Sequence, residues 1–340
     1  MSKPVTLKDI AKALGFSTST VSRALRDDYE INEETKRIVK EYAEQIAYKS
    51  NPIALSLKGR RSYSIGVVVC EVANSFFSQI INGIESIAYG RGYHVIISQS
   101  HDQYEREVIN TKHLANRSVD GLLISMSAET KDFSHLINLH ENGLPIVFFD
   151  RTIDKIQTHK VIANNFAGAF DATEMFIKNG RSHIAHLANA PHLSITKERL
   201  EGYKAALKKH SIAFNPDYVH YCSHGGMIYE EVEHAVKQIL NMPDKADAIF
   251  VSSDRLSIGC LTALKKFHAG SDSIPVAGFS NSDVVELLQP SLSYVRQPAF
   301  EMGRIATEML ISLIEAKEPV KEFETRVLDT ELFINDPNLT

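Results

Sequence analysis

The sequence predicts an α/β protein in which a three-helix, helix-turn-helix head and a short hinge helix precede two doubly wound parallel-sheet subdomains. Residues 1–49 hold amphipathic helical patterns and no strand-like run. From residue 64 onward, short apolar runs alternate with amphipathic helical segments, a pattern typical of parallel sheets covered by helices on both faces. Roughly 280 residues of this alternation exceed one comfortable core, which favours two subdomains over one.

The head begins with two short helices joined at a glycine. Thr6 and Asp9 predict a capping-box start, and Gly15 ends the first helix. Ser17 is a suitable N-cap for the second helix, and Asn32 for a third that extends to about residue 48. The polar face of the second helix carries hydroxyl and guanidinium groups, which suit the phosphates and base edges of a DNA major groove: Thr18, Ser19, Thr20, Ser22, Arg23 and Arg26. A helical hairpin used only for packing is the alternative.

The charge is divided unevenly along the chain. Residues 1–61 carry a net charge of +4, whereas the remaining residues carry −9. A modestly basic head on an acidic body is the distribution expected when only the head contacts a polyanion.

Residues 51–61 form a junction between the head and the body. Pro52 suits the first turn of a short helix, and Gly59 is expected to end that helix. Such a helix is too short to be stable alone, so we expect it to fold only against a partner. A leucine protruding from it, Leu57, could wedge a base step in the minor groove. An ordinary linker is the alternative.

The body is predicted as alternating strands and helices. The expected strands are 64–69, 94–99, 121–126, 145–150, 160–163, 183–188, 248–252, 274–279 and 292–295. The expected helices are 77–91, 104–117, 167–179, 199–210, 228–241, 255–268 and 299–316. A ligand of such a protein is expected at the carboxyl ends of the strands, in the cleft between the subdomains.

A series of motifs runs in order from about residue 5 to about residue 334. In the head and junction they are 6–11, 15–17, 20–23 and Asn51-Pro52 with Ala54 and Leu57. In the body they are 64–69, 74–77, 83–85, 119–124, 145–151, 199–203, 253–254, Gly259, 275–279, 297–298 and 302–303. On these motifs the chain resembles the LacI/GalR family of bacterial repressors.

The resemblance implies a domain organisation. Residues 1–49 would be the helix-turn-helix DNA-binding domain, 50–62 the hinge helix and linker, and 63–335 an effector-binding and dimerisation domain of periplasmic-binding-protein type. The chain would cross between the lobes near residues 163, 292 and 324. The N-subdomain would then hold 63–163 and 293–323, and the C-subdomain 164–292 and 324–335.

The resemblance also implies the DNA contacts. Thr18, Ser19 and Arg23 would face base edges, with Arg23 forming a bidentate contact to guanine. The phosphates would be held by Thr6, Thr20, Ser22, Arg26 and Asn51, and Leu57 beside Ala54 would be the minor-groove wedge. Paired heads require a two-fold homodimer, so we expect the double-stranded operator to be a pseudo-palindrome.

The effector cleft is implied at ten positions: Asn74, Phe76, Phe77, Asp150, Arg151, Arg199, Ser253, Asp254, Ser280 and Gln297. The alternatives are a core pair for the two phenylalanines and structural ion pairs for Asp150 and Arg199. The family often places acidic or amide side chains at the positions of Ser253 and Ser280, and serines weaken recognition of vicinal diols. A sugar is the leading effector; a purine, a phosphorylated metabolite or a protein corepressor are the alternatives.

Other function classes find little support in the residues. The chain lacks the GxxxxGK[ST], GxGxxG and HExxH patterns, and its three cysteines include no CxxC pair. We therefore expect no cofactor, no metal and no enzymatic activity. The polar N-terminus and the lack of an apolar run of membrane-spanning length predict a cytoplasmic protein without a membrane partner. The sequence favours an effector-controlled transcriptional repressor; the alternatives are a stand-alone ligand-binding module and an α/β enzyme.

Overall fold

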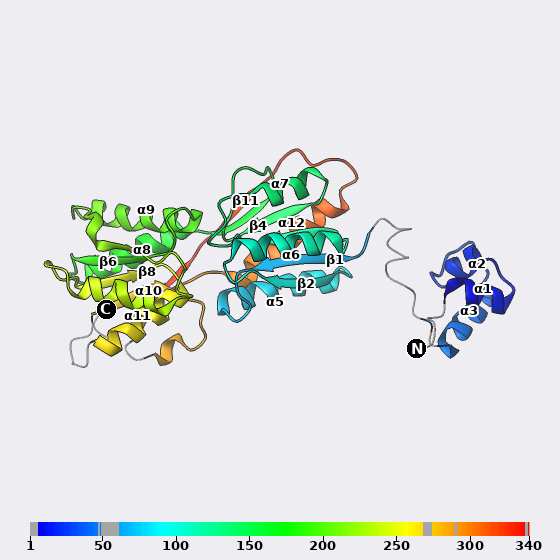
Figure 1. The fold of residues 1–340 in the computed structure, drawn as a ribbon, viewed down its shortest axis with the longest axis horizontal. Coiled ribbons are helices and arrows are strands. Elements are labelled where there is room, and N and C mark those ends of the chain that lie inside the picture. The colour runs from blue at the N-terminus through cyan, green and yellow to red at the C-terminus, as the bar shows by residue number, and fades with distance from the viewer. Residues whose placement is uncertain are drawn as a thin grey trace. The chain divides into compact units, whose positions relative to one another are not determined.

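A computed structural model describes residues 6–46, 48, 61–267, 274–288, 291–336 and 339 of the chain. The chain divides into two units, Met1–Ser62 and Tyr63–Thr340 (Figure 1). The predicted hinge helix, with Asn51, Ala54 and Leu57, lies outside the described residues. No helix within the described ranges is both long and apolar enough to span a bilayer.

The head consists of three helices, as the sequence predicts: α1 (Leu7–Leu14), α2 (Thr18–Ala24) and α3 (Glu33–Gln45). Gly15 ends α1 in the left-handed conformation, with φ of 71°. Ser17 caps α2 by accepting a hydrogen bond from the Thr20 amide at 3.0 Å. Asn32 caps α3 in the same way through the Thr35 amide at 2.7 Å.

One small core holds the three helices of the head together. Its fully buried side chains include Ile10 from α1, Val21 and Ala24 from α2, and Val39 from α3. These are the apolar positions that recur at helical spacing in each segment. Because this apolar face of α2 is buried, the opposite face, which carries hydroxyl groups and Arg23, lies on the outside.

The first lobe of the body is a parallel six-stranded sheet between helices, in the order β11-β5-β4-β3-β1-β2 (Figure 1). Its strands are β1 (Ser64–Val69), β2 (His94–Gln99), β3 (Gly121–Ile124), β4 (Ile146–Phe149), β5 (Lys160–Ala163) and β11 (Thr325–Leu328). Its helices are α5 (Ser75–Gly90), α6 (Tyr104–Asn116), α7 (Ser134–Glu141) and α12 (Ala299–Glu315). The central strands are buried along their length because helices cover both faces.

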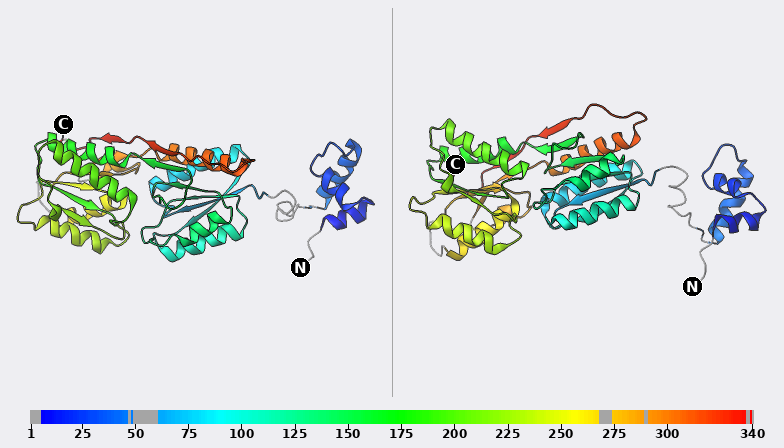
Figure 2. Two further views of the ribbon diagram at one scale, coloured as in Figure 1. Left: turned by 90° about the horizontal axis from the view of Figure 1, so that it is seen from above. Right: turned by 45° about the horizontal axis from the view of Figure 1, so that its top comes forward.

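The second lobe repeats this plan, in the order β12-β10-β9-β8-β6-β7. Its strands are β6 (Ile184–Ala188), β7 (Val219–Tyr221), β8 (Ala248–Val251), β9 (Val276–Phe279), β10 (Leu292–Arg296) and β12 (Glu331–Phe333), and only β12 runs antiparallel to its neighbour. Its helices are α8 (Asn165–Lys178), α9 (Ser194–Lys209), α10 (Tyr229–Leu240) and α11 (Asp254–Phe267). The two views in Figure 2 show both lobes as separate layered sheets joined by several chain segments.

Two of the expected crossings between the lobes are displaced. The strand β10 pairs with β9 of the second lobe, so the chain leaves that lobe after Arg296 rather than near residue 292. The strand β11 pairs with β5 of the first lobe, so the chain returns after Leu328 rather than near residue 324. Backbone pairing assigns each strand to its sheet, and this pairing is not visible in the local sequence pattern.

Two glycines let α5 and α12 of the first lobe pack backbone against backbone. A Cβ at Gly83 would lie 2.0 Å from the Phe300 carbonyl oxygen, and one at Gly303 would lie 2.1 Å from the Ile80 carbonyl oxygen. No side chain fits at either position unless the helices separate. This contact fixes α12, which leads from the second-lobe strand β10 back onto the first lobe.

We expect Gly83→Ala to lower the free energy of unfolding of the body by about 3 kcal/mol, because the new methyl group must push α12 away. Gly90→Ala at the end of the same helix is the matched control, because nothing lies within 4 Å of the position that its methyl group would take. We expect the free energy of unfolding of that control to rise by up to about 0.5–1 kcal/mol, since alanine loses less backbone entropy on folding than glycine does. Urea unfolding of both variants measures the difference, and equal effects would contradict the close approach of the helices.

Candidate functional site

The exposed face of α2 carries several of the predicted DNA-contacting side chains. Thr18, Ser19 and Arg23 are exposed, and Thr20 is half-buried. The Ser17 hydroxyl lies 2.7 Å from the Ser19 hydroxyl and 2.8 Å from the Thr20 hydroxyl. The N-terminus of α2 therefore presents a cluster of short hydroxyl groups where its backbone amides and positive dipole end also point.

Arg23 forms an ion pair with Glu30 within the head. The Glu30 amide in turn donates to the Asp28 carboxylate at 3.0 Å, which fixes the segment that carries the acid. Both side chains of the pair are about half exposed, at 47% and 49%. Such a pair is worth only about 0–1 kcal/mol, so Arg23 can exchange Glu30 for another acceptor at little cost.

Ser22 does not lie on the exposed face, contrary to its predicted role as a phosphate contact. Its side chain is buried, and its hydroxyl accepts a hydrogen bond from Arg26 Nη2 at 3.0 Å. Arg26 Nε also donates to the Ser22 carbonyl oxygen at 3.1 Å. Ser22 follows the core residue Val21 on the packed flank of α2, and Arg26, one turn later, covers it. Thr6 is exposed at the start of α1, where its amide and hydroxyl both donate to Asp9 Oδ2, at 2.8 and 2.7 Å.

A cavity of about 60 Å³ lies between the two lobes of the body. All ten predicted cleft residues line it, namely Asn74, Phe76, Phe77, Asp150, Arg151, Arg199, Ser253, Asp254, Ser280 and Gln297. Four lining residues were not predicted: Asn189, Ile195, Phe279 and Asn281. Asn189 directly follows β6, while Phe279 and Asn281 lie at the end of β9, so the rule that ligands bind at the carboxyl ends of strands could have found these three.

Arg199 is the most restrained cation of the cleft. Its Nε and Nη2 donate to Asn165 Oδ1 at 2.9 and 2.7 Å, and Nη1 donates to the Ser252 carbonyl oxygen. The guanidinium lies over the Phe279 ring, 3.7 Å from its centroid. No carboxylate among the described residues forms a salt bridge with it, and burial lowers its pKa to about 10. Among the described residues, Arg199 therefore forms no structural ion pair, which was the alternative considered for it.

Asp150 and Arg151 follow β4 at the first-lobe wall of the cleft. Asp150 is buried in the left-handed conformation, with φ of 59°, and accepts a hydrogen bond from the Ser125 hydroxyl at 3.3 Å. Burial raises the pKa of the Asp150 carboxyl, although Arg151 and Arg199 act in the opposite direction. Arg151 Nε lies 3.9 Å from Asp150 Oδ2, whereas Arg151 Nη1 forms the shorter ion pair with Asp102.

The two serines that depart from the family pattern bond to other polar side chains of the second lobe. Ser280 donates its hydroxyl proton to the Asp254 carboxylate, and Ser253 donates to Asn189 Oδ1 at 3.2 Å. Burial raises the pKa of Asp254, while the Ser280 hydrogen bond lowers it. Because the serine hydroxyls donate within these pairs, Asp254 and Asn189 are the side chains that can contact a ligand on this side of the cleft.

Phe76 and Phe77 form a core pair and also line the cleft, so they fulfil both of the roles considered for them. The rings are buried and meet edge to face, with centroids 5.2 Å apart, as a core pair does. Both also line the cavity at the start of α5, where the Asn74 side chain caps the helix through the Phe76 amide at 2.9 Å. They supply an apolar wall to the cleft.

Three buried N–H groups at the cleft have no hydrogen-bond partner among the described residues: Arg151 Nε, Asn189 Nδ2 and Gln297 Nε2. A buried donor without an acceptor costs about 1–3 kcal/mol. A ligand that presents oxygen or nitrogen acceptors to these groups would recover that cost. The cleft therefore offers hydrogen-bond donors to a small polar molecule.

Direct contacts join the lobes around the cavity. The Gln79 side-chain amide donates to the Asn281 carbonyl oxygen at 3.1 Å, and the Asn281 amide donates to Gln79 Oε1 at 2.8 Å. Arg255 of α11 forms a two-point ion pair with Glu71, with Nε 2.5 Å from Oε2. These contacts hold the lobes closely enough that only a small space remains between them. No cluster of three metal-binding side chains occurs in the part of the chain that the structure describes.

Comparison with known proteins identifies both units. Residues 6–51 match the family described as bacterial regulatory proteins, lacI family, and residues 62–331 match periplasmic binding proteins and sugar binding domain of LacI family. The HTH-type transcriptional repressor PurR of Vibrio campbellii is 30% identical over 317 residues, which cover 93% of this chain and 94% of that protein.

Solved structures agree in fold. A complex of the transcriptional regulator CelR with cellobiose has a TM-score of 0.71 and 26% identity, over 97% of this chain and 98% of that one. The lac repressor dimer bound to operator and the anti-inducer ONPF has a TM-score of 0.80 and 24% identity, over 99% of this chain and all of that one (100%). The chain belongs to the LacI family, and it is a DNA-binding transcriptional repressor with an effector-binding body.

Proposed function

We propose that this repressor reads its operator with the exposed face of α2 and that a small polar effector in the cleft sets its affinity for the operator. One observation carries the second half of this proposal. Ten residues predicted from separate segments, between positions 74 and 297, line one cavity, and three unpartnered N–H groups lie at it. With the carboxylates of Asp150 and Asp254, these groups offer a small polar ligand both donors and acceptors.

On the DNA side, Arg23, Thr18 and Ser19 are proposed to contact base edges. Thr6, Thr20, Arg26 and the junction residue Asn51 would hold phosphates, and Leu57 beside Ala54 would enter the minor groove. Two copies of the chain would bind a pseudo-palindromic operator, as the dimer in the lac repressor structure binds its operator. Among these residues Arg23 carries most of the sequence discrimination, because the other side chains are short and share their hydrogen bonds.

On the effector side, a sugar or a sugar-sized metabolite fits the groups present. The cleft offers N–H donors, two carboxylates that can accept from hydroxyl groups, and an apolar wall. The related regulator CelR binds cellobiose in its complex. Because the cavity lies between the lobes, a ligand bound there would change how far the lobes close. That movement would be passed to the junction helices and so to the operator.

The cleft is proposed to bind its ligand without chemical conversion. The residues that line it supply hydrogen-bond donors, acceptors and an apolar wall, and the chain's proposed task is binding in the bacterial cytoplasm, where its operator lies. A metabolite extract that has lost no compound after incubation with the protein is the result expected from this part of the proposal.

Selection from a random duplex library tests the DNA-binding half. The full chain should enrich a pseudo-palindrome with two half-sites, and its affinity for that duplex should fall steeply as the salt concentration rises. Adding the low-molecular-weight fraction of a bacterial extract should then shift that affinity, and the sign of the shift identifies the effector as an inducer or a corepressor. A library that shows no enriched sequence would contradict the proposal.

A further inference from the structure

Asp102 is an unusual residue that pairs with Arg151 of the cleft, and no sequence pattern singles it out. It follows β2 and precedes α6. Its backbone has φ of 61° and that of its neighbour His101 has φ of 52°, so two consecutive residues other than glycine adopt the left-handed conformation. This conformation is uncommon for such residues and costs of order 1–3 kcal/mol each, so a pair of them requires support from surrounding contacts.

With this backbone conformation, the Asp102 carboxylate contacts the Arg151 guanidinium. Its Oδ1 forms the ion pair with Arg151 Nη1 and also accepts a hydrogen bond from the Ala128 amide at 3.0 Å. Arg151 Nη1 makes two further contacts, with Cys70 Sγ and with the Met126 carbonyl oxygen, each at 3.2 Å. One end of the guanidinium is thus fixed by three partners, while its Nε has no hydrogen-bond partner among the described residues and lines the cleft.

Asp102 and Asp150 compete for the same cation. Both carboxylates lie beside the Arg151 guanidinium, but the pair with Asp102 is the closer one and Asp150 remains 3.9 Å from Nε. Asp150 keeps only the Ser125 hydroxyl as a hydrogen-bond donor among the described residues. We propose that Asp102 is a positioning residue of the effector cleft: by holding Nη1 of Arg151, it keeps Arg151 Nε and the Asp150 carboxyl available to the effector. This inference rests on the proposed function of the cleft.

The ionisation of the two acids agrees with this geometry. Burial opposes ionisation of Asp102, yet the Arg151 guanidinium holds the pKa of that carboxyl below its ordinary value. Burial raises the pKa of Asp150; Arg151 and Arg199 lower it, and the negative charge of Asp102 raises it further. Without Asp102, Arg151 would turn to Asp150 and form a neutral pair. That pair would occupy the two groups that the effector needs.

Asp102 also lies close to residues of the second lobe. Gly225 of the second lobe has φ of 60°, and a Cβ there would lie 3.5 Å from Asn189 Oδ1 and 3.9 Å from Asp102 Oδ2. A second cavity of about 390 Å³ adjoins Asp102 on its outer side, and its other charged or titratable lining groups are His101, Arg106, Glu129 and His224. The second lobe therefore comes close to the Asp102 carboxylate, whose side chain is 14% exposed.

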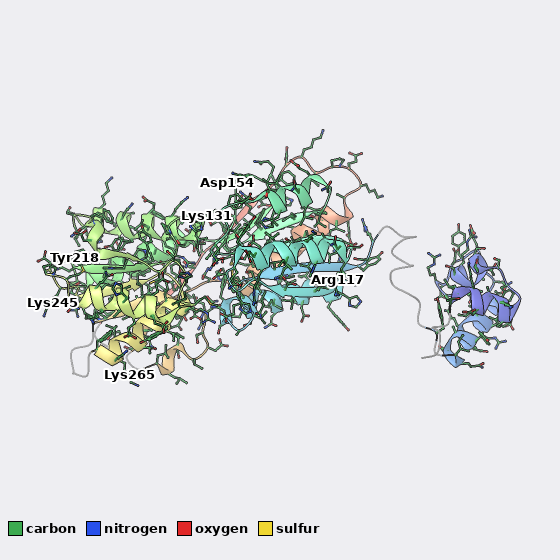
Figure 3. All side chains as sticks on the ribbon, in the orientation of Figure 1. Arg117, Lys131, Asp154, Tyr218, Lys245 and Lys265 are labelled. Carbon is green, nitrogen blue, oxygen red and sulfur yellow. The ribbon has the colours of Figure 1, made fainter. Side chains whose placement is uncertain are left out.

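Titration of the Asp150 carboxyl tests the proposal without any effector. The full-length chain is labelled with ¹³C at its aspartate carboxyl carbons, and the Asp150 signal is assigned from Asp150→Asn. We expect Asp102→Asn to lower the titration midpoint of Asp150 by about 1–3 pH units, because Arg151 moves to it. Asp154→Asn, at a fully exposed acid labelled in Figure 3, is the matched control and should leave the midpoint unchanged.

A second background separates repositioning of Arg151 from the simple loss of a like charge. In Arg151→Gln, Asp102→Asn should move the Asp150 midpoint far less than it does in the wild-type background. An equal shift in both backgrounds, or no shift in either, would overturn the proposal. If Asp102→Asn fails to fold, Arg151→Gln alone decides: the Asp102 midpoint must rise more than that of Asp150, and the reverse order overturns the proposal.

The operator response of Asp150→Asn distinguishes this inference from the proposed function. If that variant still responds to the metabolite fraction like the wild type, Asp150 is not part of the effector site and the proposed function of the cleft fails. If its response is lost while Asp102→Asn leaves the Asp150 titration unmoved, only the positioning role of Asp102 fails.

Discussion

Replacing Arg23 by glutamine is expected to weaken binding to the selected operator by about 10- to 100-fold, which corresponds to about 1–3 kcal/mol for a bidentate contact with guanine. The head should still fold, because Arg23 is exposed and its ion-pair partner among the described residues, Glu30, is exposed as well. The loss should fall mainly on one base pair of each half-site. Fluorescence anisotropy at one fixed salt concentration, on the operator and on duplexes with that pair replaced, measures the effect.

Arg37→Gln is the matched control for Arg23, since it removes the same charge from the same domain. Arg37 lies on α3, where it pairs with Glu34 and Glu41. If the head reads bases through α2, this control should reduce affinity for all duplexes by at most a small and equal factor. If Arg23→Gln instead weakens every duplex equally, Arg23 contacts phosphate and the proposed base contact is wrong.

Replacing Arg199 by methionine is expected to abolish the response to the effector while operator binding remains. Methionine fills the space over Phe279 but supplies none of the N–H groups, and it leaves Asn165 Oδ1 and the Ser252 carbonyl oxygen without their donor. The loss of those hydrogen bonds should cost about 1–3 kcal/mol of stability, so the thermal midpoint without effector must be measured first.

Binding is then read from the rise in thermal midpoint that the metabolite fraction produces. A bound effector at 100 times its dissociation constant stabilises the native state by about 2.7 kcal/mol, and Arg199→Met should lose that rise. Lys245→Met is the matched control, because it removes a positive charge from an exposed position on the outer surface of the second lobe (Figure 3). A normal rise in Arg199→Met would show that the effector binds elsewhere.

All ten cleft positions that the family resemblance implied line one cavity, and some of them also follow a simple rule. Asn74, Asp150 and Ser253 each follow a buried parallel strand, and the carboxyl ends of parallel strands meet at one edge of a sheet. Arg199 lies within α9, so only the family resemblance indicated it. Asp102 and Glu30 escaped prediction because each acts through an arginine on another segment, 49 residues away for Asp102 and 7 residues away for Glu30. Only the folded chain brings the partners together.

The sequence did not predict β7, β11, β12 or α7, because each of these elements has a weak apolar pattern. The strands β7, β11 and β12 are three or four residues long and lie at sheet edges or beside them, so they lack the continuous apolar run that marks β1 or β8. The helix α7 buries only Leu136 completely, which leaves little helical periodicity to detect. Ser22 was assigned to the wrong face of α2 because a small polar residue beside Val21 fits either a packed flank or an exposed one.

The most direct test of the account is the operator affinity of the wild-type dimer measured with and without the metabolite fraction that raises its thermal midpoint. Coupling between a ligand site and a DNA-binding domain is typically worth about 1–3 kcal/mol, so we predict a change in affinity of at least about 5-fold. The same fraction should leave the operator affinity of Arg199→Met unchanged. A fraction that stabilises the wild-type body but does not alter its affinity for the operator would contradict the claim that the cleft controls the head.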